Sequence, residues 1–254
     1  MKRLIRSFLS KLNLKIVRED KFKEILEDSK YKAIYEILRI NNSSNLMKYV
    51  ELSKSERFQD IFVIGLLKEK ENGYFVEFGA ADGIFCSNTH ILEKEFGWKG
   101  ILAEPAKIWH QRLYENRKCH ISKKCVYEKS GQLVEFSEAK YPGLSTITKF
   151  ASNDNHAPDR SSCEKYEVET ISLNELLAEN NAPNYIDYIS IDTEGSEYEV
   201  LKNLNFKKYR FGIMQIEHNN NEENRMKIRT LMKNNGYRVI EQDVASFDDF
   251  FCKI

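Results

Sequence analysis

The sequence predicts an α/β fold in which a mostly parallel sheet carries helices on both faces, ends in an antiparallel hairpin and follows an N-terminal helical extension. From residue 74 onward, short apolar runs of strand length alternate with segments of helical periodicity, which is the pattern of a parallel sheet. The last two β-rich runs are joined by the short link 244–247, which favours a hairpin at the sheet edge. Residues 1–70 show helical periodicity, so we divide the chain into an extension, 1–70, and a Rossmann-like domain, 71–254.

The individual elements follow from apolar periodicity and from turn residues. We expect strands at 74–78, 99–104, 123–129, 132–138, 185–191, 210–217, 237–243 and 248–254, and helices at 88–96, 106–116, 171–180, 197–205 and 222–236. Ser130 and Gly131 supply the turn between the third and fourth of these strands. Ser172 and Glu175 form a capping-box pair at the start of a helix. The long irregular segment 141–165 has the length of a lid or binding loop.

The composition fits a reduced, cytoplasmic protein that has no nucleic-acid partner. The 254 residues include 39 Lys plus Arg and 39 Asp plus Glu, so the formal net charge is zero. Nucleic-acid binding rewards clustered cations, and a neutral chain gives no such argument. The five cysteines form no CxxC pair, which argues against a zinc cluster and for a reducing compartment.

The N-terminal segment 1–20 is basic and moderately apolar. Its apolar residues occur singly or in pairs, so it lacks the continuous apolar core of a signal peptide. No window of the chain reaches the roughly 18 apolar residues that a transmembrane segment needs. The helical spacing of its apolar residues predicts a helix that packs on its own domain or on a second subunit of a homodimer. Peripheral contact with a membrane surface is the alternative.

A turn of small residues follows the first strand of the predicted sheet. Residues 79–83 read Gly-Ala-Ala-Asp-Gly, and small side chains let a ligand approach the backbone closely. The spacing is G-x-A-x-G and lacks the G-x-G-x-x-G of dinucleotide-binding turns. Glu104 ends the next strand, and its carboxylate can accept hydrogen bonds from two ribose hydroxyls. The turn and this acid together predict a ligand of the adenosine type at the carboxyl edge of the sheet.

Acidic residues end four of the predicted strands: Glu77, Glu104, Asp192 and Glu217. Asp192 and Glu217 follow long apolar strands, so we expect them to converge, with Glu194, His218 and Asn219 nearby. The alternative is that such acids cap the positive ends of the following helices. Helix capping is the favoured interpretation for Glu197 and a competing one for Glu194.

Residues 75–105 and 186–202, in their order and spacing, resemble the FkbM family of S-adenosylmethionine-dependent methyltransferases. The resemblance covers roughly residues 56–254. It implies the class I methyltransferase fold, a seven-stranded sheet with a reversed final strand, and methylation of hydroxyls on sugars or natural products. We therefore expect an O-methyltransferase that uses S-adenosylmethionine and acts on a sugar, a glycan precursor or a related small metabolite.

The resemblance also implies which residues bind the cofactor. The turn would face its methionine part, Glu104 would bind the ribose, and Cys125 and Val126 would lie on the adenine side. The full set of expected cofactor-binding residues is Glu77, Gly79, Ala80, Ala81, Asp82, Gly83, Ser87, Asn88, Glu104, Pro105, Cys125, Val126 and Asp192. Ala81 stands where the family has its middle glycine, a departure that adds only a methyl group.

For catalysis we expect a base, because a hydroxyl acceptor must lose its proton. His218 is the first candidate because its ordinary pKa of about 6.5 suits proton uptake near neutrality. Asp192 is the second, and Glu194 lies beside it. Asp192, Glu217 and Asn219 also supply the oxygen ligands that Mg²⁺ prefers, so a weak metal site is an open alternative to a metal-free reaction.

The acceptor is expected to meet the loop 141–165 and the end of the strand 210–217. The candidate acceptor-binding residues are Ser145, Thr146, His156, Arg160, Glu217 and Asn219. Hydroxyls and amides suit a sugar, and an arginine suits a phosphate or a carboxylate. A methyltransferase of a phosphorylated small molecule is therefore an alternative.

Other functions share parts of this pattern. A nicotinamide-dependent oxidoreductase needs the pyrophosphate-binding glycine spacing, which this turn lacks. A methyltransferase of nucleic-acid amino groups would carry paired prolines beside an aromatic residue, where this chain has Asp192-Thr193-Glu194-Gly195. A non-catalytic or nucleotide-binding interaction protein on the same fold is the remaining alternative.

Overall fold

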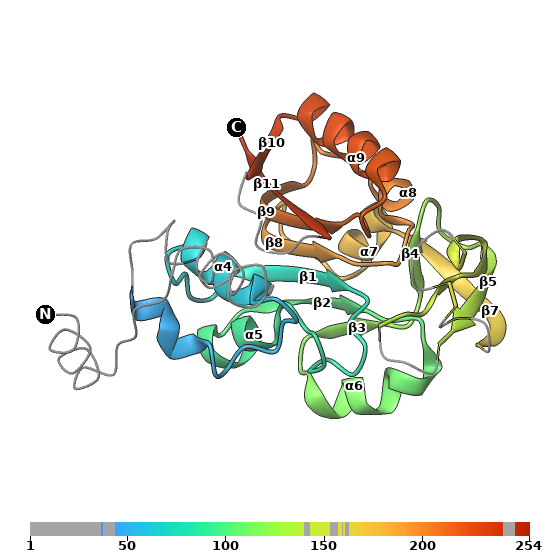
Figure 1. Ribbon diagram of the computed structural model, residues 1–254, viewed down its shortest axis with the longest axis horizontal. Coiled ribbons are helices and arrows are strands. Elements are labelled where there is room, and N and C mark those ends of the chain that lie inside the picture. Colours follow the sequence, from blue (N-terminus) through green and yellow to red (C-terminus); the bar gives the residue numbers. More distant parts are fainter. Residues whose placement is uncertain are drawn as a thin grey trace, which may run out of the picture.

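The computed structural model describes residues 37, 44–139, 143–152, 157–158, 160, 163–240 and 247–254. These residues form three layers, with helices on both faces of a central sheet and a second, smaller sheet at one end (Figure 1). The helices predicted within residues 1–36, the candidate residue His156 and most of the link 244–247 lie outside the described residues.

The central sheet has seven strands, as expected, in the order β10-β11-β9-β8-β1-β2-β3. Their bounds are β1 (Tyr74–Phe78), β2 (Lys99–Ala103), β3 (His120–Ser122), β8 (Tyr185–Ile191), β9 (Arg210–Glu217), β10 (Tyr237–Ile240) and β11 (Asp248–Lys253). The sheet is mixed. The five strands from β3 to β9 pair in parallel, and β11 pairs antiparallel with both β9 and β10. The antiparallel pairing of β10 with β11 confirms the predicted C-terminal hairpin.

Alternating side chains of the sheet enter two separate apolar clusters. Val76 and Ile101 pack with α7 (Leu173–Glu179), α8 (Glu197–Leu201) and α9 (Glu222–Asn234). Phe75 and Leu102, their neighbours along the same strands, pack on the opposite face with α4 (Gln59–Leu66), α5 (His90–Phe96) and α6 (His110–Asn116). Both faces are therefore closed, as the apolar character of the central strands predicts.

The second sheet has four strands in the order β4-β7-β5-β6. They are β4 (Cys125–Tyr127), β5 (Leu133–Glu138), β6 (Thr146–Ile147) and β7 (Glu164–Ser172), with the short helix η3 (Thr148–Phe150) after β6. The predicted strand 123–129 corresponds to β4 alone, which joins this second sheet, whereas β3 of the central sheet ends at Ser122 and was not predicted. The turn at Ser130 and Gly131 does not pair β4 with β5, since β7 lies between them.

The predicted helix start at Ser172 is confirmed. The Ser172 hydroxyl accepts a hydrogen bond from the Glu175 N–H, at 3.3 Å. In a full capping box the Glu175 side chain would accept the Ser172 N–H. Here this N–H donates instead to the Ser130 hydroxyl, at 2.9 Å. This exchange ties the turn after β4 to the end of β7.

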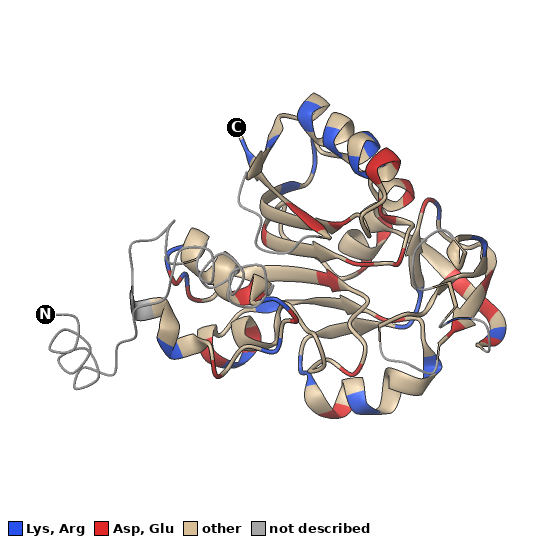
Figure 2. Ribbon diagram, viewed as in Figure 1, with Lys and Arg blue, Asp and Glu red and all other residues tan. Residues whose placement is uncertain are grey.

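The described part of the N-terminal segment packs against the central sheet. It comprises Ile37, the short helix η1 (Ser44–Tyr49), α4 and the segments around them. Ile61, Phe62 and Ile64 of α4 are almost fully buried in the same cluster as Phe75 of β1. Within the residues that the structure describes, none of the helices has both the length and the apolarity needed to cross a membrane. Figure 2 shows Lys and Arg interspersed with Asp and Glu along most elements.

A buried polar network joins α4 to the sheet. Gln59 and Gln215 both donate through Nε2 to Asp248 Oδ2, at 3.1 and 2.9 Å. The Tyr188 hydroxyl donates in turn to Gln215. Burial raises the pKa of Asp248 to about 8. Because the folded state disfavours the ionised carboxylate, Asp248 opposes folding increasingly as the pH rises from its ordinary pKa of 3.8 toward about 8.

We predict that Asp248→Asn removes this pH dependence. The asparagine carbonyl can accept both glutamine bonds, so the fold should persist. The wild-type free energy of unfolding should fall relative to the variant between about pH 5 and about pH 8, by up to about 1.4 kcal/mol per pH unit. Urea unfolding of both proteins across this range measures the effect, and parallel pH profiles would contradict the prediction.

Candidate functional site

The turn after β1 lies directly against the end of β8. Gly79 has φ +71°, and a Cβ added there would lie 2.3 Å from the carbonyl oxygen of Asp192. The Gly79 N–H donates to the Ala103 carbonyl of β2, at 3.1 Å. Glycine is therefore needed at this position for its backbone conformation and for the close approach of two strand ends.

Glu104 connects the turn to the end of β2. Its Oε2 accepts the Ala81 N–H and its Oε1 accepts the Ala106 N–H, both at 2.8 Å. Burial raises the pKa of Glu104 to about 7 in spite of these two donors. Each carboxylate oxygen has a second lone pair, so the group can still accept hydrogen bonds from a ligand. Ala81 itself has φ +44°, the left-handed conformation that explains why a glycine would suit this position.

Several residues that were expected to contact the cofactor instead form hydrogen bonds with residues that follow the turn. Glu77 Oε2 accepts from the hydroxyls of Ser87 and Thr89, at 3.0 and 2.5 Å, and Glu77 Oε1 accepts the Asn88 N–H, at 2.6 Å. Arg117, which is 2% exposed, donates to the Gly83 carbonyl and to both hydroxyls. The structure therefore places Glu77, Ser87 and Asn88 in a supporting network and away from the cavities described below.

The remaining turn residues also have local partners. Asp82 Oδ1 accepts the N–H groups of Ile84 and Phe85, at 2.9 and 2.7 Å. Gly83 packs on the aliphatic part of Arg117, and Ala80 is buried in the cluster beneath α4 and α5. Sequence reasoning missed Arg117, because it follows the mostly polar helix α6 and precedes Lys118, so no local pattern distinguishes it from an exposed cation.

A pocket with an empty volume of about 560 Å³ opens beside Glu104; we call it the inner pocket. It lies between the carboxyl ends of β1, β2 and β8 and the second sheet. Its lining residues are Phe78, Gly79, Ala103, Glu104, Pro105, Trp109, Cys125, Val126, Phe136, Gly143, Ser145, Ile147, Asp192, Thr193, Glu194 and Ser196. The lining resembles that of a small-molecule site in its chemistry, because apolar side chains surround a few convergent polar groups.

The inner pocket brings together eight of the predicted site residues: Gly79, Glu104, Pro105, Cys125, Val126, Ser145, Asp192 and Glu194. Its apolar walls Trp109, Phe136 and Ile147 were missed by sequence reasoning. Trp109 lies within the predicted helix 106–116, but Phe136 and Ile147 belong to a sheet whose β7 was not predicted.

A larger cleft, with an empty volume of about 1720 Å³, adjoins the inner pocket; we call it the outer cleft. It is lined by Ser53, Lys54, Ser55, Glu56, Arg57, Ile84, Phe85, Cys86, Gly143, Leu144, Asp192, Glu194, Glu217, Asn219 and Phe247. Gly143, Asp192 and Glu194 line both spaces. A molecule in the outer cleft can therefore meet a molecule in the inner pocket at these residues. The contribution of residues 53–57 was also missed.

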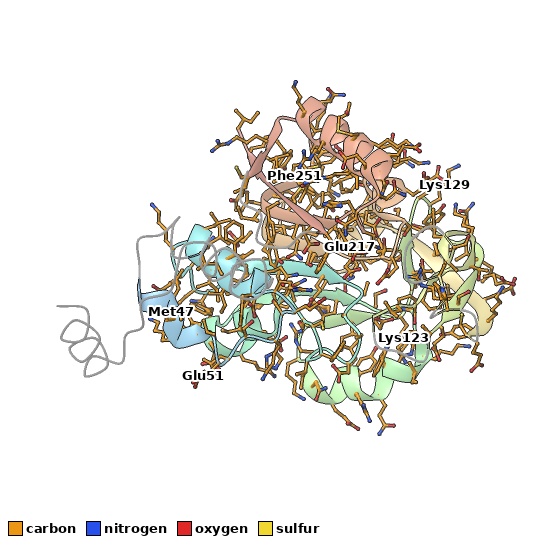
Figure 3. The ribbon with its side chains drawn as sticks, viewed as in Figure 1. Met47, Glu51, Lys123, Lys129, Glu217 and Phe251 are labelled. Carbon is orange, nitrogen blue, oxygen red and sulfur yellow. The ribbon has the colours of Figure 1, made fainter. Side chains whose placement is uncertain are left out.

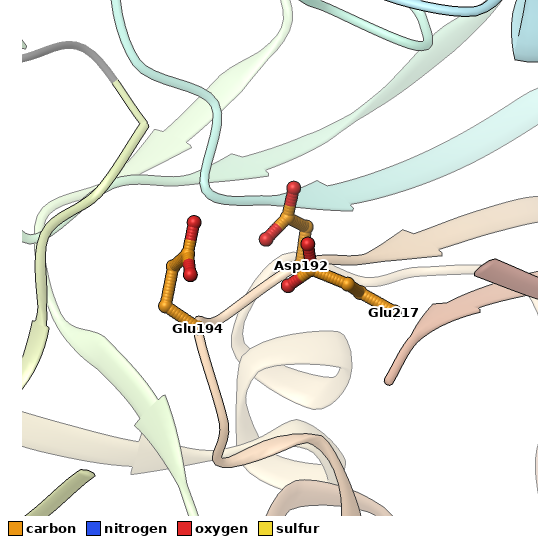
Figure 4. Close-up of side chains that lie close together, drawn as sticks. All are labelled: Asp192, Glu194 and Glu217. Atoms are coloured by element: carbon orange, nitrogen blue, oxygen red, sulfur yellow. The ribbon is translucent and has the colours of Figure 1, made fainter. Parts of the chain in front are cut away.

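Three carboxylates meet at this junction. Asp192, Glu194 and Glu217 each offer an oxygen within 4.8 Å of the others, and Figure 4 shows the three side chains gathered at the ends of β8 and β9. Figure 3 shows Glu217, which is buried, near the middle of the view, whereas Met47 and Glu51 lie at the end of the molecule that carries η1. The predicted convergence of Asp192 and Glu217 is thus observed.

Burial and mutual repulsion control the protonation of these acids. Burial raises the pKa of Asp192 to about 6. The pKa of Glu217 is raised well above its ordinary value by burial and then by the charges of Asp192 and Glu194. Asp192 Oδ1 is buried without a hydrogen-bond partner among the described residues. Asp192 therefore changes its ionisation near neutral pH, and its Oδ1 has a lone pair that no hydrogen bond among the described residues uses.

Glu194 is connected to the loop that covers the junction. Arg160 donates to Glu194 Oε2 at 2.7 Å and to the Leu144 carbonyl at 2.6 Å. The Thr146 hydroxyl donates to the Glu194 carbonyl at 3.0 Å, and Asn219 Nδ2 donates to the carboxylates of Glu194 and Glu217. Arg160 and Thr146 thus hold the loop against β8, and the structure shows neither of them lining the two cavities.

His218 is placed apart from the three carboxylates. It lines a separate depression with Tyr198 and Asn221, and burial lowers its pKa. Its Nδ1 accepts the Asn220 N–H at 3.2 Å, so the neutral ring carries its proton on Nε2, which lies 4.0 Å from Asp249 Oδ1. The neutral ring therefore has no free lone pair with which to act as a base.

The carboxylate cluster has the donor set of a hard divalent cation. Asp192, Glu194 and Glu217 supply the oxygens that Mg²⁺ prefers. Asn219, expected as a third ligand, presents its Nδ2 to two of the carboxylates and would have to turn its amide to ligate. The geometry thus replaces Asn219 by Glu194 in the predicted ligand set.

Comparison with known proteins identifies a family whose model matches this sequence. A family model described as the methyltransferase FkbM domain matches residues 77–239. A solved SAM-dependent methyltransferase from Aquifex aeolicus is similar at 12% identity and a TM-score of 0.36, with 82% of this chain and 97% of that chain covered. A fibrillarin/Nop5p complex is similar at 13% identity and a TM-score of 0.35, with 76% and 79% covered. No curated protein matches the sequence.

We predict that Gly79→Ala is more damaging than Gly131→Ala. The two glycines have nearly equal φ values, +71° and +72°, but an added Cβ at Gly131 meets nothing within 4 Å. The difference between the variants therefore isolates the contact with the Asp192 carbonyl. Gly79→Ala should lower the free energy of unfolding by about 1–3 kcal/mol more than the control, the range for overpacked sites. Equal losses in chemical denaturation would contradict this assignment.

Proposed function

The chain belongs to the FkbM methyltransferase family, and from this premise we propose that it transfers a methyl group from S-adenosylmethionine to a hydroxyl oxygen. The proposed acceptor is a sugar, a glycan precursor or a related small metabolite. The observation that carries the proposal is the junction of the two cavities, where Asp192 and Glu194 line both the inner pocket and the outer cleft.

The inner pocket fits the cofactor in its chemistry. Val126, Phe136 and Ile147 supply apolar surface for an adenine ring, and Glu104 can accept the ribose hydroxyls. Gly79 keeps the floor of the pocket free of a Cβ. We assign Glu104 to the ribose and the junction to the methionine part.

The cofactor supplies an electrophilic methyl carbon on a sulfonium. The chain must then hold an acceptor oxygen in line with that carbon, which is a positioning task for the outer cleft. As the new C–O bond forms and the C–S bond breaks, the hydroxyl proton must leave the acceptor. We assign the Asp192 carboxylate to receive it, because Asp192 lines both cavities and its Oδ1 has no hydrogen-bond partner among the described residues.

Asp192 suits this role better than His218. Its pKa of about 6 leaves it largely ionised at neutral pH while keeping it basic enough to accept a proton. Glu217 retains its proton to higher pH, so the pair avoids two adjacent charges. A divalent cation on the three carboxylates is the alternative, and it would instead lower the pKa of a bound hydroxyl.

We predict that Glu104→Ala weakens S-adenosylmethionine binding by about tenfold or more, because a hydrogen bond to a charged group contributes about 1.5–3 kcal/mol. His218→Ala, outside the inner pocket, should change the affinity little. Binding should also strengthen as the pH rises through about 7, since only the ionised Glu104 accepts both hydroxyls. Isothermal titration calorimetry measures all three effects. Equal losses in the two variants would show that the ribose lies elsewhere, and no binding by the wild type would remove the proposed function.

We predict that Asp192→Asn lowers turnover by about 10²–10⁴-fold, the usual contribution of a general base. The asparagine has nearly the same shape, so S-adenosylmethionine should bind with similar affinity. Formation of S-adenosylhomocysteine with an acceptor gives the rate, and calorimetry on the same preparation gives the affinity. Turnover equal to that of the wild type would exclude Asp192 as the base.

A further inference from the structure

Two groups of residues with different charge line the outer cleft. The acids Asp192, Glu194 and Glu217 come from the ends of β8 and β9. The segment 53–57, just before α4, contributes Lys54 and Arg57, the two basic residues of the lining, together with Glu56. We propose that this segment binds an anionic group, a phosphate or a carboxylate, on the acceptor. The proposal rests on the proposed function for its meaning, but its test does not need the cofactor.

Arg57 has unused hydrogen-bonding capacity. Its Nε is buried and has no hydrogen-bond partner among the described residues. Glu56 Oε1 lies 3.3 Å away without the alignment of a hydrogen bond, and the Glu56 side chain is 51% exposed. The guanidinium also faces the ring of Phe247, 5.8 Å from its centroid. A planar guanidinium with free N–H groups matches the geometry of a phosphate or a carboxylate.

Two buried arginines near the site, Arg117 and Arg160, already have carboxylate partners. Arg117 donates to Glu93 at 2.6 Å, and Arg160 donates to Glu194 at 2.7 Å. Arg160 was the residue expected to recognise an acceptor anion, and this ion pair directs it to Glu194 instead. Arg57 and the exposed Lys54 are thus the cations that the outer cleft offers to a ligand.

The segment 53–57 is held in place, as a recognition site requires. The Ser53 hydroxyl donates to Asp60 Oδ1 at 2.7 Å, and the Lys54 N–H donates to Asp60 Oδ2 at 3.3 Å. The Arg57 N–H donates to Gln59 Oε1 at 2.8 Å, and Gln59 bonds the buried Asp248. The position of Arg57 is therefore fixed by the same network that attaches α4 to the sheet.

The remaining lining of the outer cleft is partly apolar. Ile84 and Phe85 line the cleft, and Phe85 remains 48% exposed. An exposed aromatic ring in a cleft offers a face for the body of a small ligand. The acceptor that fits these features has a hydroxyl near Asp192, a ring or short chain over Phe85 and an anionic group at Arg57.

The test is a titration of the full chain, without cofactor, by inorganic phosphate, glucuronate and uncharged glucose at constant ionic strength. The side-chain Nε–H signal of Arg57 is followed by two-dimensional ¹⁵N–¹H NMR. Arg57→Gln identifies that signal. The exposed Arg112 of α6, which lines neither cavity, provides an internal control.

Saturable shifts of the Arg57 signal with phosphate or glucuronate, and none with glucose, are expected. Whichever anion binds more tightly distinguishes a phosphate from a carboxylate acceptor. Arg57→Gln should weaken the binding by at least about tenfold, measured on backbone signals of residues 53–57, and Arg112→Gln should leave it unchanged.

Two results would overturn the proposal: no saturable response to either anion, or anion affinity in Arg57→Gln equal to that of the wild type. Failure here would leave S-adenosylmethionine binding, measured separately, unaffected. Absence of cofactor binding would instead remove the proposed function while leaving the anion site in place.

Discussion

The close contact between the turn after β1 and the end of β8 organises this molecule. Gly79 lies so near the Asp192 carbonyl that a side chain cannot be accommodated. This contact brings the acid of β8 to the wall of the inner pocket, and the Ala81–Glu104 hydrogen bond adds the acid of β2. Arg117, Glu77 and the hydroxyls around α5 hold the turn from behind. Ligand chemistry at the pocket therefore depends on backbone geometry set by buried partners.

The sequence predicted every strand of the central sheet except β3, because the other strands are apolar and separated by clear turn signals. It also predicted that Glu104, Asp192 and Glu194 would face one space, because the carboxyl ends of parallel strands share an edge. It did not predict β7, whose residues 164–169 alternate between charged and other side chains over an exposed face. Missing β7 concealed the second sheet, and with it the apolar walls Phe136 and Ile147.

Several residues expected at the site instead form hydrogen bonds with other residues of the chain. Glu77, Ser87 and Asn88 stand at the right place in the chain for cofactor contacts, but burial gives them internal partners that no local pattern reveals. His218 follows a buried strand, as predicted, yet its ring turns to the Asn220 N–H. The direction of a side chain after a strand depends on tertiary contacts, so residue type and position alone cannot decide it.

The floor and the roof of the inner pocket come from different sheets. The floor belongs to parallel strands whose pairing positions the carboxylates. Phe136 and Ile147 instead come from β5 and β6, which among the described strands pair with each other, and β5 also with β7. Substitutions in the roof can therefore change the apolar surface of the inner pocket without disturbing the register of the parallel strands. The shape of the pocket can thus vary from one side while the acids on the opposite side keep their positions.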